Sequence, residues 1–408
     1  MKITFSKKQT QFLKEAHARW NFKTGATRSG KTRLDQIAVI PLRIREVHGK
    51  DGLVVFIGNT KTTLQRNLIE PMQDFFGRSL VSDIGSNNTA FVFGEKVHCL
   101  GADKVSQVKR LQGSSIKYCY GDEVATWSEE VFTMLKSRLD HSYSKFDGTC
   151  NPEHPKHWLK QFLDQEDDID IYHQRYQLDD NPFLDKEVKE NIKKEYAGTV
   201  FYKRYVLGEW ALAEGLIYQE IADNADKFLI GADELPKQME VFLGVDFGKN
   251  KSDTAFTATG IYDNKLYVLL AESVPMSGKT YNQLENDFQK FLDLYSNQYS
   301  YKISMVFADS AEPTYINSFR KKFPDVPIRG SIKHEIIDRI RATNILIGGE
   351  RIKFVRGRCD VLIDGLSEAV WDEDQADDVR LDDGTSNIDI LDSFEYSWEY
   401  YLNQLVRL

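Results

Sequence analysis

Two sets of residues in this chain have the types and spacing that phosphate chemistry requires. The first is the segment Gly25–Thr32 (GATRSGKT), which matches the P-loop pattern of spaced glycines followed by Lys and Ser or Thr. The second is a set of carboxylates far downstream, around Asp246, Asp309 and Asp392. The P-loop predicts that the chain binds a nucleoside triphosphate, and the carboxylates predict a metal-dependent nuclease.

Each of these P-loop residues has an expected role in binding the nucleotide or its Mg²⁺ ion. Gly25 and Gly30 let the backbone curl so that its N–H groups face the phosphates, and we expect Ser29 to join the same cradle. Lys31 is expected to reach the β- and γ-phosphates, and the Thr32 hydroxyl is expected to hold Mg²⁺.

Two further residues are candidate ATP contacts with open alternatives. Arg28, inside the loop, either contacts the γ-phosphate or is solvated. Gln9 precedes the loop and either reads the adenine edge or lies on the surface.

A second ATPase element ends an apolar strand expected at residues 116–121. Asp122 follows that strand and is expected near Mg²⁺, and Glu123 is the candidate base that orients and polarises the attacking water. Thr149 and Asn151 end the next strand-like stretch. Taken alone, Asn151 before a proline indicates a plain turn, although an Asn at such a strand end could also sense the γ-phosphate.

The downstream carboxylates occupy three different expected elements. Asp246 lies near the end of a strand at 241–248, Asp309 ends a strand at 304–309, and Asp392 lies on an amphipathic helix at 386–402. Asp389 is three residues before Asp392, so both face one side of that helix. Converging carboxylates can hold two divalent ions, and Mg²⁺ or Mn²⁺ suits an all-oxygen site best.

These residues require an α/β scaffold to bring them together. In the first half, short apolar runs at 53–58, 97–101 and 116–121 alternate with longer amphipathic stretches, which indicates a largely parallel sheet covered by helices. In the second half, 254–259 and 265–270 are expected to be antiparallel strands of a meander.

Bulk properties narrow the class of protein. A length of 408 residues favours two or three domains, and four widely spaced cysteines without a CxxC pair argue against zinc and disulfides. The net charge of −9 argues against a tight, sequence-independent DNA binder that acts alone. Without a bilayer-spanning apolar run or a signal-peptide pattern, we expect a soluble, intracellular protein with no membrane partner.

Taken in order, the motifs resemble one family. The chain is similar to the large subunit of tailed-bacteriophage (or prophage) terminases, the motor-nucleases of DNA packaging. The phrases that carry the resemblance cover nearly the whole chain and are GATRSGKT, YGDE, TCNP, DDNPFL, LGEW with AEG, VDFG, FADSAEP and DILDSFEY.

The resemblance implies an architecture and roles. It implies a RecA-like ATPase of the additional-strand type at 1–201, a linker subdomain at 202–233 and a ribonuclease H-like nuclease at 234–408. It also implies that Thr149 and Asn151 form the coupling motif that relays hydrolysis to DNA movement. Related nucleases can carry His at the position of Asp389, so this Asp either adds a metal ligand or weakens catalysis by repulsion.

The resemblance further implies the cofactors, the partners and the place of action. They are ATP with Mg²⁺, two Mg²⁺ or Mn²⁺ at the nuclease, double-stranded DNA, a small terminase subunit, the procapsid portal, and a ring of copies, expected to be a pentamer. The place is the host bacterial cytoplasm, with transient docking on the portal. A trans-acting arginine is expected, with four candidates: Arg66, Arg78, Arg110 and Arg138.

Two rival functions stay open at this point. One is a helicase or repair-type ATPase whose C-terminal domain is not catalytic, and the other is an assembly protein that uses ATP as a slow switch. A transposase interpretation of the carboxylates leaves the P-loop unexplained. The sequence does not distinguish headful from sequence-specific cutting.

Overall fold

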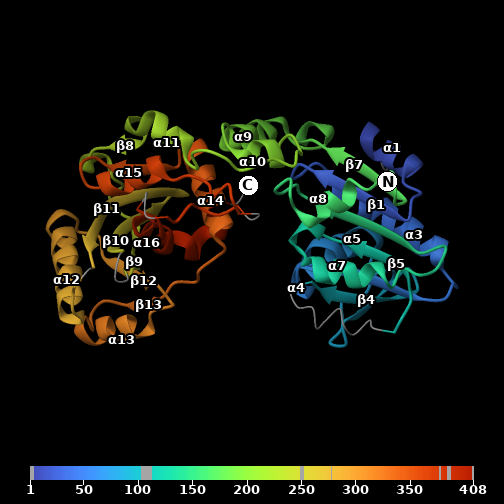
Figure 1. Ribbon diagram of the computed structural model, residues 1–408, viewed down its shortest axis with the longest axis horizontal. Coiled ribbons are helices and arrows are strands. Elements are labelled where there is room, and N and C mark those ends of the chain that lie inside the picture. The colour runs from blue at the N-terminus through green and yellow to red at the C-terminus, as the bar shows by residue number, and fades with distance from the viewer. Residues whose placement is uncertain are drawn as a thin grey trace. The chain divides into compact units, whose positions relative to one another are not determined.

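The chain folds into two compact units. The computed structural model describes residues 4–102, 113–248, 252–276, 278–375, 378–383 and 387–406. The first unit comprises Met1–Lys189 and Phe201–Leu212, and the second comprises Glu190–Val200 and Ala213–Leu408 (Figure 1). The segment at 202–233 is therefore shared between the units. No helix in the described ranges combines the length and the apolar character needed to cross a bilayer.

The first unit is built on a seven-stranded sheet of order β3-β4-β2-β5-β6-β1-β7. All neighbouring pairs are parallel except β3 with β4, which confirms the expected largely parallel sheet. The strands are β1 (Trp20–Gly25), β2 (Leu53–Gly58), β3 (Thr89–Val92), β4 (Glu95–Gly101), β5 (Ile116–Gly121), β6 (Lys145–Cys150) and β7 (Ile171–Tyr176).

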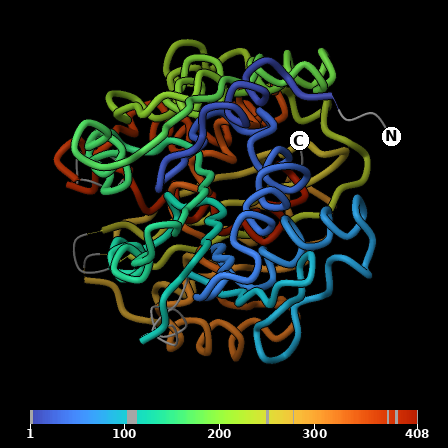
Figure 2. The backbone as a smooth tube through the Cα atoms, turned by 90° about the vertical axis from the view of Figure 1, so that its right-hand side faces the viewer, coloured from blue at the N-terminus to red at the C-terminus, as the bar shows by residue number. Residues whose placement is uncertain are grey.

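Helices flank this sheet, and Figure 2 shows the same unit from a direction 90° away. The helices are α1 (Lys7–Glu15), α2 (Lys31–Leu34), α3 (Ile40–Val47), α4 (Lys61–Leu64), α5 (Glu70–Phe76), α7 (Glu129–Lys136), α8 (Trp158–Leu163) and α10 (Val200–Tyr205), while α9 (Lys186–Tyr196) is divided between the two units. A π-helical turn at Asp35–Val39 joins α2 to α3, so the helix after the P-loop runs on to Val47. Ile40, Ile44 and Val47 bury its apolar side against β2, β4 and β5.

The second unit has its own seven-stranded sheet, of order β13-β12-β9-β10-β11-β14-β8. Its centre is the expected antiparallel meander β9-β10-β11, flanked by strands that pair in parallel. The strands are β8 (Leu229–Ile230), β9 (Glu240–Asp246), β10 (Asp253–Tyr262), β11 (Lys265–Pro275), β12 (Ile303–Ala308), β13 (Ile328–Gly330) and β14 (Ile352–Val355).

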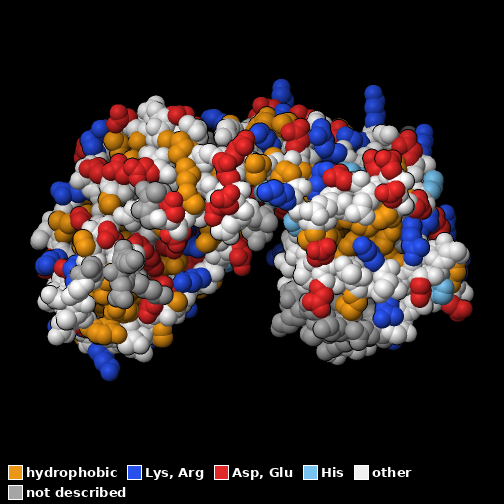
Figure 3. Space-filling view, in the orientation of Figure 1, with side chains coloured by type: hydrophobic (Ala, Val, Ile, Leu, Met, Phe, Trp, Pro, Cys, Tyr) orange, Lys and Arg blue, Asp and Glu red, His pale blue; other side chains and the backbone are white. Residues whose placement is uncertain are grey.

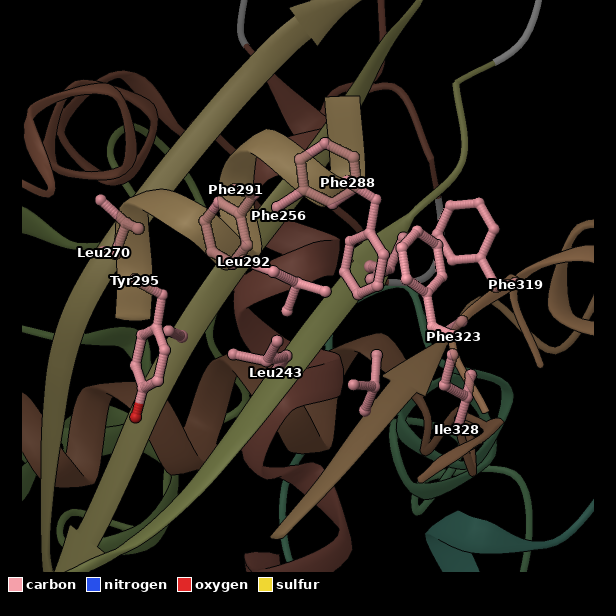
Figure 4. Packing of buried hydrophobic residues seen from close by; sticks show 14 of the residues in the cluster. Leu243, Phe256, Leu270, Phe288, Phe291, Leu292, Tyr295, Phe319, Phe323 and Ile328 are labelled. Carbon is pink, nitrogen blue, oxygen red and sulfur yellow. The ribbon is translucent and has the colours of Figure 1, made fainter. Parts of the chain in front are cut away.

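An aromatic core fixes two helices of this unit against the sheet. Phe288 on α12 lies 5.6 Å from Phe256 of β10 and 4.8 Å from Phe319 on α13, measured between ring centroids (Figure 4). The helices of the second unit are α11 (Gln219–Asn224), α12 (Tyr281–Gln298), α13 (Pro313–Lys322), α14 (Ile336–Gly348), α15 (Asp360–Glu368), α16 (Ile388–Trp398) and α17 (Leu402–Leu405).

The surface of the described residues mixes charges. On the face seen in Figure 3, acidic (red) and basic (blue) side chains are mixed, and the described residues form no continuous basic surface on that face. The basic residues around β14 do not lie on an exposed strand edge, because β14 pairs with β11 on one side and with β8 on the other. This edge is covered because residues 229–230 form a short additional strand.

Candidate functional site

The P-loop opens onto a cavity at one edge of the first sheet. Since β1, β5 and β6 are parallel, the residues that follow them lie at the same edge. The cavity has a volume of about 380 Å³, within the range of small-ligand pockets. It is lined by Thr27, Arg28, Ser29, Gly30, Lys31, Thr32, Arg33, Glu123, Asn151, Asn181 and Leu184. The structure therefore brings together most of the predicted nucleotide residues.

The first P-loop glycine is required by close backbone packing. Gly25 has a φ of +132°, and a Cβ added there would lie 1.9 Å from the Tyr176 carbonyl oxygen of β7. Gly208 of the LGEW segment packs against the same point, because its Cβ would lie 2.3 Å from the Tyr176 carbonyl oxygen and 2.9 Å from the Gly25 Cα. Any side chain at Gly25 would therefore push the loop away from β7.

Lys31 is folded back onto the P-loop. Its ammonium donates to the carbonyl oxygens of Gly25 at 2.9 Å and Ala26 at 2.6 Å, and to Asn151 Oδ1 at 3.2 Å. Burial lowers the pKa of Lys31, and the nearby Glu123 carboxylate opposes that shift. The ammonium is thus held at the mouth of the cavity by neutral oxygens and by nearby negative charge.

The two predicted coupling residues contact the two predicted Walker B carboxylates. Thr149 donates to Asp122 Oδ1 at 3.2 Å, and the Asn151 amide donates to Glu123 Oε2 at 3.3 Å. Burial raises the pKa of Asp122, and the hydrogen bond from Thr149 partly offsets that shift. Asn151 therefore bridges Lys31 and Glu123, which is a connection that a plain Asn-Pro turn does not explain.

Gln9 and Arg28 take defined positions beside the loop. Gln9 is buried, donates to the Gly30 carbonyl at 3.1 Å and accepts from the Ser6 backbone N–H. With both ends of its amide engaged, Gln9 supports the loop in this conformation. The carbonyl of Arg28 accepts from the Asn181 amide at 2.7 Å, which ties the DDNPFL segment to the loop.

The carboxylates of the second unit converge at the end of β9. Strands β9 and β12 are parallel neighbours, and the Asp309 N–H donates to the Val245 carbonyl at 2.9 Å. Asp246 and Asp309 therefore leave adjacent strands at the same edge. Both side chains are buried, with 7% and 8% of their residues' surface exposed.

Helix α16 reaches this edge because small residues let it approach the sheet. A Cβ added to Gly244 on β9 would lie 1.8 Å from the Ser393 carbonyl. The hydroxyls of Thr257 and Ser393 are 2.6 Å apart, and Thr259 donates to Ser397 at 2.9 Å. This contact brings Asp392, one residue before Ser393, to the other two carboxylates.

The three carboxylates differ in their charge compensation. Burial raises the pKa of Asp246 well above its usual value, and the charges of Asp392 and Asp309 raise it further. Within the described residues, the Asp246 side chain has neither a hydrogen bond nor an ion pair. Asp392 is paired with Arg339 at 3.2 Å and Arg380 at 2.6 Å.

Asp389 faces a different partner. Its Oδ2 accepts from the backbone N–H of Asp253 at 2.8 Å. Burial raises its pKa, and this hydrogen bond partly offsets the shift. Among the described residues, no group of three or more Asp, Glu, His or Cys side chains is arranged to hold a metal ion as it stands. The all-oxygen donor set and the uncompensated Asp246 nevertheless fit a hard divalent cation.

The cations at this site have no local signature in the sequence. Arg380 lies in an acidic run that precedes α16, and Arg339 lies on α14, yet both pair with Glu395, which is 1% exposed. Lys333 pairs with Asp309 at 2.5 Å from another distant segment. Asn181, which lines the nucleotide cavity, was not among the predicted site residues, and its position in the DDNPFL motif was the one feature of the sequence that pointed to it.

Comparisons with known proteins agree with this arrangement. The family model described as "Terminase large subunit, T4likevirus-type, N-terminal" matches residues 24–222. No curated protein matches the chain. The structure of the large terminase from a thermophilic bacteriophage superposes with a TM-score of 0.83 at 25% identity and covers 98% of this chain and 99% of its own.

Two further structures of that thermophilic-phage large terminase cover the same shares of both chains. The complex with ATP-gamma-S has a TM-score of 0.79 at 25% identity, and the complex with ADP has a TM-score of 0.79 at 26% identity. The match spans both units. Residues 24–222 therefore match the N-terminal domain of the phage terminase large subunits, and the chain as a whole is similar in structure to a phage large terminase.

Proposed function

We propose that the chain is an ATP-driven translocase of viral double-stranded DNA that also cleaves concatemeric DNA with a metal-dependent endonuclease. The observation that carries the motor assignment is the bridge made by Asn151 between Lys31 and Glu123. A side chain that contacts both the phosphate-binding lysine and the candidate base can respond to the state of the nucleotide. That response is the requirement for a coupling residue.

In the proposed ATPase, bound ATP would supply the phosphoryl group, and Mg²⁺ would compensate the negative charge of the phosphates. Lys31 would leave its carbonyl partners for the β- and γ-phosphates, because a phosphate is a stronger acceptor than a neutral carbonyl. Thr32 and Asp122 would hold Mg²⁺, and Glu123 would orient the attacking water. Arg28 and Ser29 complete the cradle of the loop.

Asn151 would then lose its partner Lys31, so its contact with Glu123 changes at the same time. Thr149 keeps Asp122 in place through its hydroxyl. Gln9 would support the loop through Gly30, which accounts for its burial better than recognition of a base does. The related large terminase solved in complex with ATP-gamma-S supports nucleotide binding by this chain.

In the proposed nuclease, Asp246, Asp309 and Asp392 would hold two Mg²⁺ or Mn²⁺ ions. Such ions supply a hydroxide nucleophile and stabilise the leaving oxygen. The chain's own contribution is a rigid edge that holds three carboxylates on β9, β12 and α16. Asp389 is a further candidate ligand, but it must first give up its bond to the Asp253 N–H.

The domain division and the partners belong to the same proposal. We assign a RecA-like motor of the additional-strand type to 1–201, a linker to 202–233 and a ribonuclease H-like nuclease to 234–408. A small terminase subunit would supply DNA recognition, and a pentameric ring of copies would dock on the portal in the host cytoplasm.

Arg66 and Arg78 are exposed and stay candidates for the trans-acting arginine; Arg110 lies outside the described residues.

The test compares two variants in two assays. Full-length wild type, Lys31→Ala and Asp246→Ala are assayed for ATP hydrolysis and for plasmid cleavage with Mn²⁺. We expect Lys31→Ala to lose only ATP hydrolysis and Asp246→Ala to lose only cleavage. Procapsids carrying the portal should stimulate hydrolysis by wild type.

Three results would contradict the proposal. Absence of cleavage by folded wild type with normal ATPase activity would favour the helicase-type alternative. Cleavage that survives in Asp246→Ala would move the nuclease elsewhere. Very slow hydrolysis that procapsids do not stimulate would favour an ATP switch.

A further inference from the structure

A lysine reaches the carboxylate site from a segment outside the elements that carry the carboxylates. Lys333 lies between β13 and α14, and its Nζ is 2.5 Å from Asp309 Oδ1. The same Nζ lies 5.7 Å from the ring centroid of Tyr396 on α16. Its charge also lowers the pKa of Asp246, against the much larger effects of burial and of the other carboxylates. The ammonium therefore acts on both strand carboxylates.

The backbone of Lys333 is held in an uncommon conformation. Its φ is +54°, in the left-handed region that a residue with a side chain seldom adopts. The Glu399 carboxylate, 1% exposed, accepts from the Lys333 N–H at 2.9 Å and from the His334 N–H at 3.1 Å. The Ser331 N–H donates to the Ala308 carbonyl at the end of β12. A strained residue persists where its surroundings hold it, and here they fix the lysine beside Asp309.

The other cations of the site are already paired with other carboxylates. Arg339 and Arg380 both contact Asp392 and Glu395, which makes two positive and two negative charges. Among the described residues, Lys333 is the one cation that pairs with Asp309. Among the described residues, the positive charge that faces Asp246 and Asp309 is therefore that of the Lys333 ammonium.

We propose that Lys333 is a built-in counter-ion that competes with a divalent cation for Asp309. The inference rests on the proposed nuclease. Metal would bind only as the ammonium moves off the Asp309 oxygen, so the lysine lowers the site's affinity for metal. It also keeps the carboxylates together in the metal-free protein, since they would otherwise repel one another.

The experiment measures Mn²⁺ binding by the full-length protein, with free Mn²⁺ followed by electron paramagnetic resonance. Lys333→Gln should bind Mn²⁺ roughly tenfold more tightly, the effect of removing one partly solvated unit charge at contact distance. Lys333→Arg keeps the charge and should stay within about twofold of wild type on the same argument. The matched control is Lys279→Gln, which removes a similar ion pair to Asp287 (2.6 Å) on α12 and should change nothing.

A second variant weakens the hydrogen bonds that hold the backbone of Lys333, without altering the lysine itself. Glu399→Gln replaces one accepting oxygen by an amide nitrogen, which cannot accept, so the segment around Lys333 is held less firmly. We expect tighter Mn²⁺ binding than in wild type, by less than in Lys333→Gln. Unchanged binding in Glu399→Gln would contradict the role of the strained segment.

Asp246→Asn separates failure of this inference from failure of the proposed nuclease. If Asp246→Asn weakens Mn²⁺ binding while Lys333→Gln leaves it unchanged or weaker, the counter-ion proposal is overturned and the metal site stands. If wild type binds no Mn²⁺, or if Asp246→Asn has no effect on Mn²⁺ binding, both the proposed metal site and the counter-ion role of Lys333 are refuted.

Discussion

The buried ion pair beneath the P-loop gives the sharpest test of how the first unit is held together. Lys23 on β1 and Asp35 on the helix after the P-loop are 2.8 Å apart, and both side chains are 0% exposed. The ammonium also lies 3.7 Å from the ring centroid of Phe12. Neither charged group has another hydrogen-bond partner among the described residues. Lys23→Met leaves Asp35 buried and unpaired, which should destabilise the unit by up to about 3–5 kcal/mol at a pH high enough to ionise Asp35 in the variant.

The sign of the pH dependence follows from Asp35. Burial raises its pKa from 3.8 to about 7, and Lys23 opposes the shift, so the pKa in Lys23→Met must be higher still. Because the carboxyl pKa is higher in the folded than in the unfolded state, the native state carries one more proton than the unfolded state at any pH between those two pKa values. Stability contributed by this group is therefore fully present at low pH and is lost as the pH rises through the folded pKa. The penalty of Lys23→Met should be small near pH 6 and should grow above pH 7, by up to roughly 1.4 kcal/mol per pH unit.

Hydrogen exchange of the β1 amides, followed by mass spectrometry, reports on the first unit separately. A loss of about 4 kcal/mol corresponds to exchange roughly a thousandfold faster. Lys23→Met/Asp35→Asn removes both charges and should recover part of the loss, since it leaves only an unpaired amide that costs about 1–3 kcal/mol.

The matched control is Lys8→Met, which breaks a partly exposed pair with Asp180 (2.9 Å) and should cost less than about 1 kcal/mol. A Lys23→Met protein that exchanges like wild type at pH 8, or that is less stable at pH 6 than at pH 8, would refute the reasoning.

Three further predictions concern the two sites. Glu123→Gln should reduce ATP hydrolysis by roughly 10²–10⁴ while nucleotide binding, measured by equilibrium dialysis, is kept; equal loss of both would argue against a base. Gly244→Ala forces a Cβ against the Ser393 carbonyl and should destabilise the second unit at the upper end of roughly 1–3 kcal/mol in calorimetry; an unchanged transition would mean that α16 can move without cost. Arg380→Met removes one of two cations from buried Glu395 and should cost about 3–5 kcal/mol in the same measurement, whereas a stabilised protein would show that the pair is replaceable.

Much of the architecture follows from local patterns in the sequence. The strand before Asp122 and the strand that ends in Asp246 are apolar runs, and the structure confirms both of them. Parallel pairing then dictates that residues following these strands meet at one edge, so the nucleotide cavity could be predicted from motif order. The three-residue spacing of Asp389 and Asp392 also predicts a shared helix face, but their partners differ.

What the sequence by itself determined is therefore which residues could do chemistry and which elements carry them. Only the tertiary structure decided what neutralises and orients them. Lys333, Arg339 and Arg380 come from a loop, a helix and an acidic run without a local signature, because ion pairs depend on distance in space and not along the chain. The bridge from Asn151 to Lys31 and Glu123 was likewise settled by packing, since three separate segments must meet before those side chains can touch.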